Sequence, residues 1–470
     1  MSNEIEVAAK QDDELKDVEI SKDDDLAYDN NDSNDDASYE NLSWIGRIMS
    51  VIKIYWSLGL IAFGGPQAHV ALLREHLVVN KKRIDEDTFT ELFAIGQGLP
   101  GPTSTQLVVS TALYQGGPLG GLIAFFFWNV PGLIVLLICA LLIKTYIDPN
   151  NPPWFLVGIP PAAISLVFKA FYGFGLKLDK LGIVLALISC NVAILINGDY
   201  YIPKQSSQYV FPSMLIAGAL FTLIDSKRAK PFGTLYDKSP NAGWDGTSLQ
   251  TFKRIGIPIY VGFFILLIWA AVLTLSICLV RLTDNDNVYL EIFEVMFRVG
   301  SLIFGGGQVV LPMLEDEVVP KWMTREQFYY GLGITQSLPG PLFNFSAYLG
   351  AVYQGVAGGF IAWLGLFGPG VILIFAITPF WARLRHYQWF KAILLGLNAT
   401  AIGLVGAACV LLWEGAVHTY ADAIVFCTAL TAAVCFTIQA PFVVIGGGVL
   451  GAILSKDAAS LGQVPFCLNN

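Results

Sequence analysis

Two Pro-Gly-Pro triplets interrupt apolar stretches of the chain, at Pro100-Gly101-Pro102 and at Pro339-Gly340-Pro341. Proline lacks an amide hydrogen and its ring clashes with the preceding turn, so a helix must break at each triplet. Thr103 and Ser104 follow the first triplet, where a new half-helix would begin with unpaired amides and the positive end of its dipole. Amides and hydroxyls gathered in this way predict an anion-binding site that needs no fixed cation.

The candidate site consists of the residues around both triplets and of two glycine-rich stretches, each ending the first apolar segment of one half. Glycine there permits close approach of the backbone to a ligand, although tight helix packing explains it nearly as well. The triplets have a similar alternative as kinks that shape packing, but two kinks that each follow a glutamine at the same spacing favour a site. The predicted substrate-binding residues are Gly64, Gly65, Pro66, Gln97, Pro100, Gly101, Pro102, Thr103, Ser104, Gly305, Gly306, Gly307, Gln308, Gln336, Pro339, Gly340, Pro341 and Asn344.

Charged residues are rare within the apolar segments, and two basic ones, Lys169 and Arg298, are candidates for the path of an anion. A charge inside the membrane is a functional hypothesis by default. A long basic side chain can instead extend to the membrane interface. The sequence leaves both interpretations open, and no pair of carboxylates in the apolar segments suggests a proton relay.

Lipid must surround the elements that position these residues. Hydrophobic residues make up 54% of the 470 residues, charged residues make up 14%, and the mean hydropathy is +0.59. Backbone groups in lipid must be paired within the chain, and these apolar runs are too continuous for alternating barrel strands. The sequence therefore predicts an all-α, polytopic transmembrane helical bundle of about 13 spans, several of them broken by Pro or Gly. The candidate spans are 44–66, 89–114, 119–146, 154–176, 180–197, 209–225, 256–281, 287–306, 326–349, 354–380, 390–413, 420–437 and 440–455.

The chain contains two homologous copies of one repeat. Four motifs recur in the same order at offsets of 241, 239, 239 and 238 residues. They are Phe63-Gly64-Gly65 with Phe304-Gly305-Gly306, Gln97 to Pro102 with Gln336 to Pro341, Tyr114-Gln115-Gly116 with Tyr353-Gln354-Gly355, and Pro131-Gly132 with Pro369-Gly370. Seven predicted spans precede the second copy, and an odd number places the copies in opposite orientations, an inverted repeat of the kind found in secondary transporters.

Basic residues give mixed support to this topology. The linker carries Lys227, Arg228 and further Lys and Arg residues, so we expect it to be cytoplasmic, together with the loop at 380–391. The cluster Lys81-Lys82-Arg83 would then lie on the opposite side. If residues 54–79 formed a re-entrant hairpin, that cluster would move inside, but the linker would move out.

Six segments follow from these patterns. Residues 1–43 form an acidic tail, which we expect to be disordered because its charge density leaves little to bury. The others are transmembrane repeat 1 at 44–225, a polar linker loop at 226–254, a connecting span at 255–285, transmembrane repeat 2 at 286–456 and a C-terminal tail at 457–470.

Several functional classes lack their motifs. No GxxxxGK[ST] loop is present, so we expect no ATP motor. The four His and seven Cys show neither HExxH nor CxxC spacing, so we expect no metal site and no disulfide framework. We predict a protein that is not an enzyme, has no cofactor and binds no nucleic acid.

The motifs resemble those of the chromate ion transporter (CHR) family in its long-chain, two-domain form. The resemblance rests on Phe63-Gly64-Gly65-Pro66-Gln67-Ala68-His69 with Gln97 to Gln106, and on Phe304 to Gly307 with Gln336 to Phe345, and it covers about 44–456. It implies an integral membrane protein, expected in the plasma membrane, that exports chromate or a related tetrahedral oxyanion by secondary transport coupled to the proton gradient. The partners implied are an inorganic oxyanion (chromate, with sulfate as its look-alike) and the lipid bilayer. The alternatives are a sulfate-type importer, an anion channel and a transporter-like sensor, and a homodimer is left open.

Overall fold

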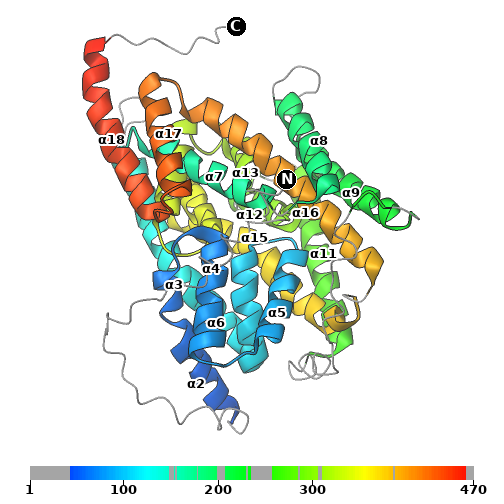
Figure 1. The fold of residues 1–470 in the computed structure, drawn as a ribbon. Coiled ribbons are helices and arrows are strands. Elements are labelled where there is room, and N and C mark those ends of the chain that lie inside the picture. Colours follow the sequence, from blue (N-terminus) through cyan, green and yellow to red (C-terminus); the bar gives the residue numbers. More distant parts are fainter. Residues whose placement is uncertain are drawn as a thin grey trace, which may run out of the picture. The chain divides into compact units, whose positions relative to one another are not determined.

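The structure is a computed structural model. It describes residues 43–147, 153, 156–176, 178–197, 207–228, 231–233, 257–283, 286–304, 310–384 and 387–461, which contain helices and no strand (Figure 1). The prediction for the acidic tail falls on residues outside this description, as do most of the polar linker and the C-terminal tail. The rest of this section concerns the unit that begins at Ser43.

Corresponding helices fill the two halves of this unit, with one helix between them. The first half contains α2 (Trp44–Tyr55), α3 (Leu58–Ile61), α4 (Gly65–Arg74), the π-helix η2 (Glu75–Asn80), α5 (Glu86–Gly98), α6 (Thr103–Tyr146), α7 (Ile159–Gly175), α8 (Lys180–Asn197) and α9 (Ser207–Ser226). Helix α11 (Ile259–Arg281) connects the halves. The second half contains α12 (Val288–Leu302), α13 (Val310–Val318), α14 (Arg325–Ser337), the 3-10 helix η5 (Leu342–Asn344), α15 (Phe345–Leu384), α16 (Gln388–Ala416), α17 (Tyr420–Val434) and α18 (Ala440–Leu461).

The first helices of each half fold back on themselves at the glycine-rich stretches. In the first half, the His76 side chain hydrogen-bonds to the backbone of Ile54. Ile54 lies ten residues before Gly64 and His76 lies twelve residues after it, so the chain turns back at Gly64. In the second half, Arg298 of α12 lies 2.8 Å from Glu317 of α13. These contacts require antiparallel hairpins, 44–80 and 288–318, rather than the continuous first span that the sequence predicted.

The Pro-Gly-Pro triplets also form the tips of hairpins. A Cβ placed on Gly96 of α5 would lie 3.7 Å from the Leu107 amide of α6, eleven residues further on. A continuous helix would separate these residues by about 16 Å. In the second half, the Tyr348 hydroxyl donates to the Gln327 carbonyl at 2.8 Å. The predicted spans 89–114 and 326–349 are therefore each a helix–break–helix hairpin, because the break reverses the chain instead of kinking it.

Helices α6 and α15 each reverse direction once more within their length. Gly117 has φ 66° and ψ −166°, and Gly355 has φ 65° and ψ −159°, which are not helical values. Next to each turn the two arms touch, since a Cβ on Gly121 would lie 3.2 Å from the Val109 carbonyl. Nothing lies within 4 Å of a Cβ placed on Gly117, so close packing does not require glycine there. Glycine is needed at this turn because other residues rarely adopt a positive φ.

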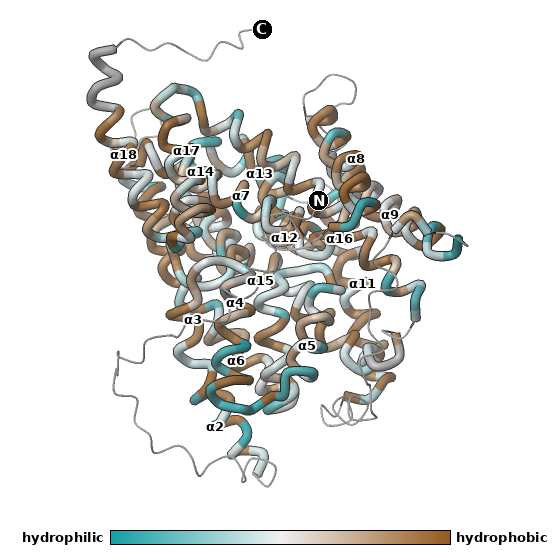
Figure 2. Tube along the Cα trace, viewed as in Figure 1, coloured by the Kyte–Doolittle hydropathy of each residue, from teal (hydrophilic) through white to brown (hydrophobic). Residues whose placement is uncertain are grey.

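The long second arms of α6 and α15, which follow these turns, pack antiparallel at the centre of the unit. Gly121 faces Phe375 near one end, and Gly359 faces Leu137 near the other. Around this pair, α16 packs against α7, α8 and α9, and α7 packs against α17 and α18. Helix ends and tight turns carry most of the hydrophilic residues, while the helix bodies are apolar (Figure 2). The core that holds the candidate site is therefore built from both halves of the chain.

The protein is an all-helical bundle with several apolar helices. In the described residues, five helices are long and apolar enough to cross a membrane. They are Trp44–Ile61, Thr103–Tyr146, Ile259–Arg281, Leu342–Trp381 and Gln388–Ala416, and five shorter apolar helices accompany them. The predicted total of about 13 spans is not confirmed, and the hairpins at the Pro-Gly-Pro breaks argue for fewer complete crossings.

Candidate functional site

The tips of the hairpins from the two halves are joined by a reciprocal pair of backbone hydrogen bonds. The Gly101 amide donates to the Ile303 carbonyl at 2.8 Å, and the Gly340 amide donates to the Ala62 carbonyl at 2.8 Å. Each bond connects a Pro-Gly-Pro triplet of one half to the residue just before the glycine-rich stretch of the other. Each Pro-Gly-Pro triplet thus lies against the other repeat, the first at Ile303 and the second at Ala62.

Each triplet also rests on the Pro-Gly pair of the other half's long helix. A Cβ on Gly101 would lie 2.8 Å from the Gly370 Cα, and a Cβ on Gly132 would lie 3.0 Å from the Pro339 carbonyl oxygen. Side chains would not fit in either contact, so glycine allows the backbones to meet. The fourth repeated motif, Pro131-Gly132 with Pro369-Gly370, therefore belongs to the same site as the triplets.

Two buried amide side chains occupy equivalent places beside these contacts. Gln106 donates through Nε2 to the Pro100 carbonyl at 2.8 Å and to the Gly370 carbonyl at 3.4 Å. Asn344 donates through Nδ2 to the Asn129 carbonyl at 3.2 Å and accepts from the Trp363 indole at 3.0 Å. The sequence offset of 239 paired Asn344 with Thr105, but these contacts make Gln106 its structural counterpart, at an offset of 238.

The first turn of α6 combines unpaired donors with unpaired acceptors. Its N-cap is Pro102, which provides no side-chain cap, so the first amides of the helix have no intrahelical partner. Thr105 Oγ1 and Gln106 Oε1 are buried without a hydrogen-bond partner among the described residues. Ser104 is 3% exposed. Buried polar groups are nearly always hydrogen-bonded in native proteins, so unpaired ones beside a helix N-terminus indicate a place for a polar ligand.

Three further polar groups near the tips were missed by the sequence interpretation. His69 Nδ1, Trp128 Nε1 and Asn129 Oδ1 are buried and lack a hydrogen-bond partner among the described residues. The His69 ring meets the Trp128 ring edge-on, with centroids 5.1 Å apart. His69 ends the first family motif, which was the available signal, whereas Trp128 and Asn129 could not be found, because only the fold brings them to the tip.

The other predicted residues are placed as follows. Gly64, at the turn of the first hairpin, and Gln97 are exposed, while Gly65, Pro66 and Thr103 are half-buried. Gln336 donates to the Ala163 carbonyl at 3.0 Å, so its side chain connects α14 to α7. Pro100, Gly101 and Pro102 are buried, as is Pro341. Gly305, Gly306, Gly307 and Gln308 lie outside the described residues.

Arg298 is paired with two carboxylates. Its Nε donates to Glu294 at 2.6 Å, and its Nη1 and Nη2 donate to Glu317 at 2.8 and 3.0 Å. Each of its three nitrogens thus donates to a carboxylate, so Arg298 holds α12 and α13 together and its positive charge is balanced by Glu294 and Glu317. Lys169 lies half-buried on α7, six residues beyond Ala163, and remains a candidate for the path.

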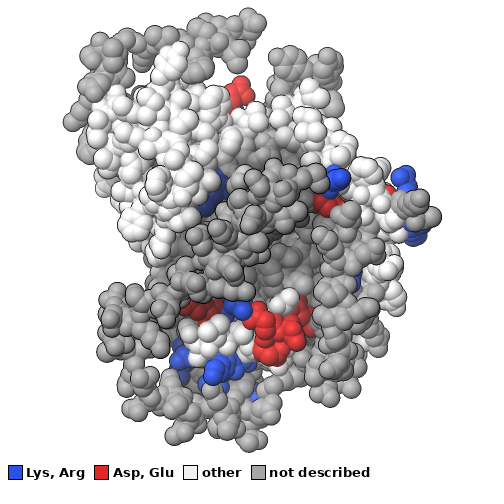
Figure 3. Space-filling view, viewed as in Figure 1, with Lys and Arg blue, Asp and Glu red and all other residues white. Residues whose placement is uncertain are grey.

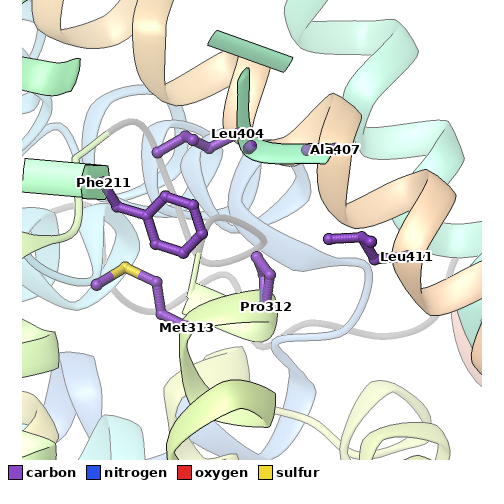
Figure 4. Close-up of a pocket in the computed structure, with 7 residues that line it drawn as sticks. Phe211, Pro312, Met313, Leu404, Ala407 and Leu411 are labelled. Carbon is purple, nitrogen blue, oxygen red and sulfur yellow. The ribbon is translucent and has the colours of Figure 1, made fainter. Parts of the chain in front are cut away.

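A narrow apolar cavity, without room for a water molecule, lies between α8, α9, α13 and α16. Its lining is entirely apolar and includes Phe211, Met313 and Leu404 (Figure 4). An apolar lining offers no donors to an anion, so this cavity is not the substrate site.

Comparison of this sequence with known proteins finds similarity to transporters. The profile described as Chromate transporter matches residues 49–224 and 290–452, one match in each half and together more than half of the chain. A chromate transport protein of Pseudomonas aeruginosa is 25% identical over 75% of this chain and 78% of its own length. An uncharacterized transporter of Methanocaldococcus jannaschii is 25% identical over 76% and 83%, and a chromate transport protein of Cupriavidus metallidurans is 19% identical over 86% and 93%. No solved structure matches. The chain is thus an integral membrane transporter rather than an enzyme, and it belongs to the chromate transporter family.

Proposed function

We propose that this protein moves chromate, or a related tetrahedral oxyanion such as sulfate, across the plasma membrane by secondary transport, and that export of the anion is coupled to the proton gradient. The observation that carries the proposal is the reciprocal pair of hydrogen bonds from each Pro-Gly-Pro triplet to the other half of the chain, with unpaired buried polar groups beside them. Relatives named as chromate transport proteins support the choice of anion. The site would bind the anion between the tips through backbone amides and hydroxyls.

Flux in proteoliposomes tests this function. We expect chromate to accumulate against its own concentration gradient when a pH gradient or a membrane potential is imposed. A channel would only let the anion equilibrate in response to the imposed potential, with no dependence on the pH gradient, and a sulfate importer would prefer sulfate in the opposite direction. A chain that moves neither anion under any gradient would favour the sensor alternative and overturn the proposal.

Ser104→Ala tests the place of the site. The loss of one hydrogen bond to a charged group costs about 1.5–3 kcal/mol. Because about 1.4 kcal/mol corresponds to a factor of ten, we expect chromate affinity to fall by roughly ten- to a hundredfold. Ser110→Ala is the matched control, since Ser110 lies on the same helix and donates to the Leu107 carbonyl at 3.0 Å. Equal affinities for wild type and Ser104→Ala would place the anion elsewhere, with Lys169 as the next candidate.

We further propose that the two repeats have opposite orientations in the membrane. Each hairpin returns the chain to the side where it began, so the first half crosses with the second arm of α6 and with α7, α8 and α9. Helix α11 adds a fifth crossing, and an odd number inverts the second half. Lys81-Lys82-Arg83, the linker and the loop near Lys391 then all lie on one side, which the excess of basic residues identifies as cytoplasmic.

The two hairpins in the first half thereby remove the conflict that the charges alone presented. On the face seen in Figure 3, charged side chains gather over α5 and α6, while the surface over α17 and α18 carries few. Lipid would cover an uncharged surface of this kind, and the charged end would face water.

Cysteine labelling tests the orientation. Asp87 and Glu326 are exposed residues in the first turns of α5 and α14, at the repeat offset of 239. In a cysteine-free background, we expect an impermeant maleimide to reach Asp87→Cys only from the cytoplasmic side and Glu326→Cys only from the outside. Labelling of both positions from one side would contradict the inverted arrangement.

A further inference from the structure

His69 lies where the two repeats meet. It is 1% exposed, and its Nε2 lies 3.0 Å from the Ala62 carbonyl oxygen. The same carbonyl accepts the Gly340 amide at the tip of the second repeat. A carbonyl oxygen can only accept, so Nε2 carries the hydrogen in this contact. Through one oxygen atom, the imidazole of the first repeat is therefore linked to the Pro-Gly-Pro break of the second.

The other nitrogen of this ring is an unused, buried proton acceptor. In the neutral tautomer with hydrogen on Nε2, Nδ1 carries a lone pair, and it has no hydrogen-bond partner among the described residues. Leaving a buried acceptor unpaired is unfavourable, so we expect Nδ1 of His69 to gain a hydrogen-bond partner in another state of the protein. A proton on Nδ1, accompanied by an anion, is such a partner.

The charges around the tips lead to the same conclusion. The elements that pack on His69 are α3, α6 and the tip of the second repeat. Residues 57–68, 103–143 and 336–344 of these elements contain no Asp, Glu, Lys, Arg or His, and their titratable side chains are those of Tyr114 and Cys139. A dianion bound there would meet no fixed positive charge, and burying it without one would be costly. Histidine is the side chain that changes charge near neutral pH.

We propose that His69 takes up one proton when the tips bind the tetrahedral dianion, so that proton and anion are carried together. This inference rests on the proposed function and names its coupling residue. The repeat offset places Val310 at the matching position of the second half, and valine cannot be protonated. One proton is therefore taken up per site. A dianion and a proton together carry one net negative charge, so an interior-negative membrane potential drives their export, whereas a pH gradient that is acid outside opposes the outward movement of the proton.

The test uses the purified full chain and measures chromate affinity from about pH 6 to about pH 8, where histidine changes charge. Protonated His69 favours the anion, so wild-type affinity falls as the pH rises, by up to about tenfold per pH unit for one linked proton. His69→Gln keeps an Nε2 donor for Ala62 but cannot be protonated. Chromate also takes up a proton in this range, so each point compares both proteins in one solution, and the ratio of their affinities should approach one at high pH.

Proton uptake supplies the second readout. In weakly buffered solution, we expect wild type to take up about one proton more per bound chromate than His69→Gln. His76→Gln is the matched control, because His76 lies seven residues beyond His69 on the same arm of the hairpin, in η2 and away from the tip, and should leave uptake unchanged. A wild-type protein that binds chromate with no more uptake than the free anion requires would overturn the role of His69 and leave the proposed function intact. If His69→Gln folds poorly, His69→Asn replaces it, and the wild-type measurement needs no variant. Failure of wild type to bind any tetrahedral oxyanion would instead overturn the function itself.

Discussion

Gly101→Leu is expected to reduce chromate transport by more than a hundredfold while the protein still reaches the membrane. Gly101 has φ 125°, and a Cβ there would lie 2.8 Å from the Gly370 Cα. A side chain in such a backbone conformation costs about 1–3 kcal/mol. The clash would also separate the Gly101 amide from the Ile303 carbonyl, and so uncouple the two repeats at one of their two tip contacts. Initial transport rates in proteoliposomes, normalised to the amount of protein, give the measurement.

The control for this variant must add the same side chain where space is open. No atom lies within 4 Å of a Cβ placed on Gly446 of α18, so Gly446→Leu should transport like wild type. Gly447 of the same helix cannot serve as the control, because a Cβ there would collide with Ala162 of α7. If Gly101→Leu and Gly446→Leu transport equally well, the Pro-Gly-Pro tip is not part of the transport site.

The breaks in the apolar segments could be predicted from sequence because proline and glycine act locally. A triplet such as Pro339-Gly340-Pro341 cannot continue a helix whatever surrounds it. The repeat followed from the order and offset of four motifs, and the profile matches fall in the same two halves. Whether a break kinks a helix or reverses the chain depends on contacts across the break, such as Gly96 with Leu107. Those contacts join residues that no local pattern relates.

The candidate site could be predicted only in part, because sequence patterns are local and do not show which distant residues meet. Its backbone elements carry recognisable motifs, and the fold joins them through Gly101 and Gly340. The side chains that would complete it, Trp128 and Asn129 among them, lie in an apolar helix where nothing distinguishes them from ordinary core residues. Arg298 shows the same limit, because its carboxylate partner Glu317 lies nineteen residues away across a hairpin and could not be paired with it from the sequence.

Asn344→Leu is expected to weaken chromate affinity by about ten- to a hundredfold and also to lower the thermal stability of the protein. Asn344 is 1% exposed, and its side chain joins the tip of the second repeat to the long helices of both repeats. Leucine would leave the Asn129 carbonyl and the Trp363 indole buried without partners. Each unpaired group costs about 1–3 kcal/mol, whereas the volume of the side chain changes little. The loss therefore reports broken hydrogen bonds rather than a cavity.

Stability and affinity must be measured together, because Asn344 supports the tip and also lies beside the proposed anion. Thr378→Val in α15 is the matched control, since Thr378 is 1% exposed and its hydroxyl donates to its own helix at the Ile374 carbonyl. Gln106→Leu removes the equivalent amide of the first repeat and should lower affinity to a similar degree. If Asn344→Leu lowers stability but leaves chromate affinity at the wild-type value, the amide only holds the tip in place. If it lowers affinity far more than Gln106→Leu does, the anion lies closer to the tip of the second repeat, on the side of His69.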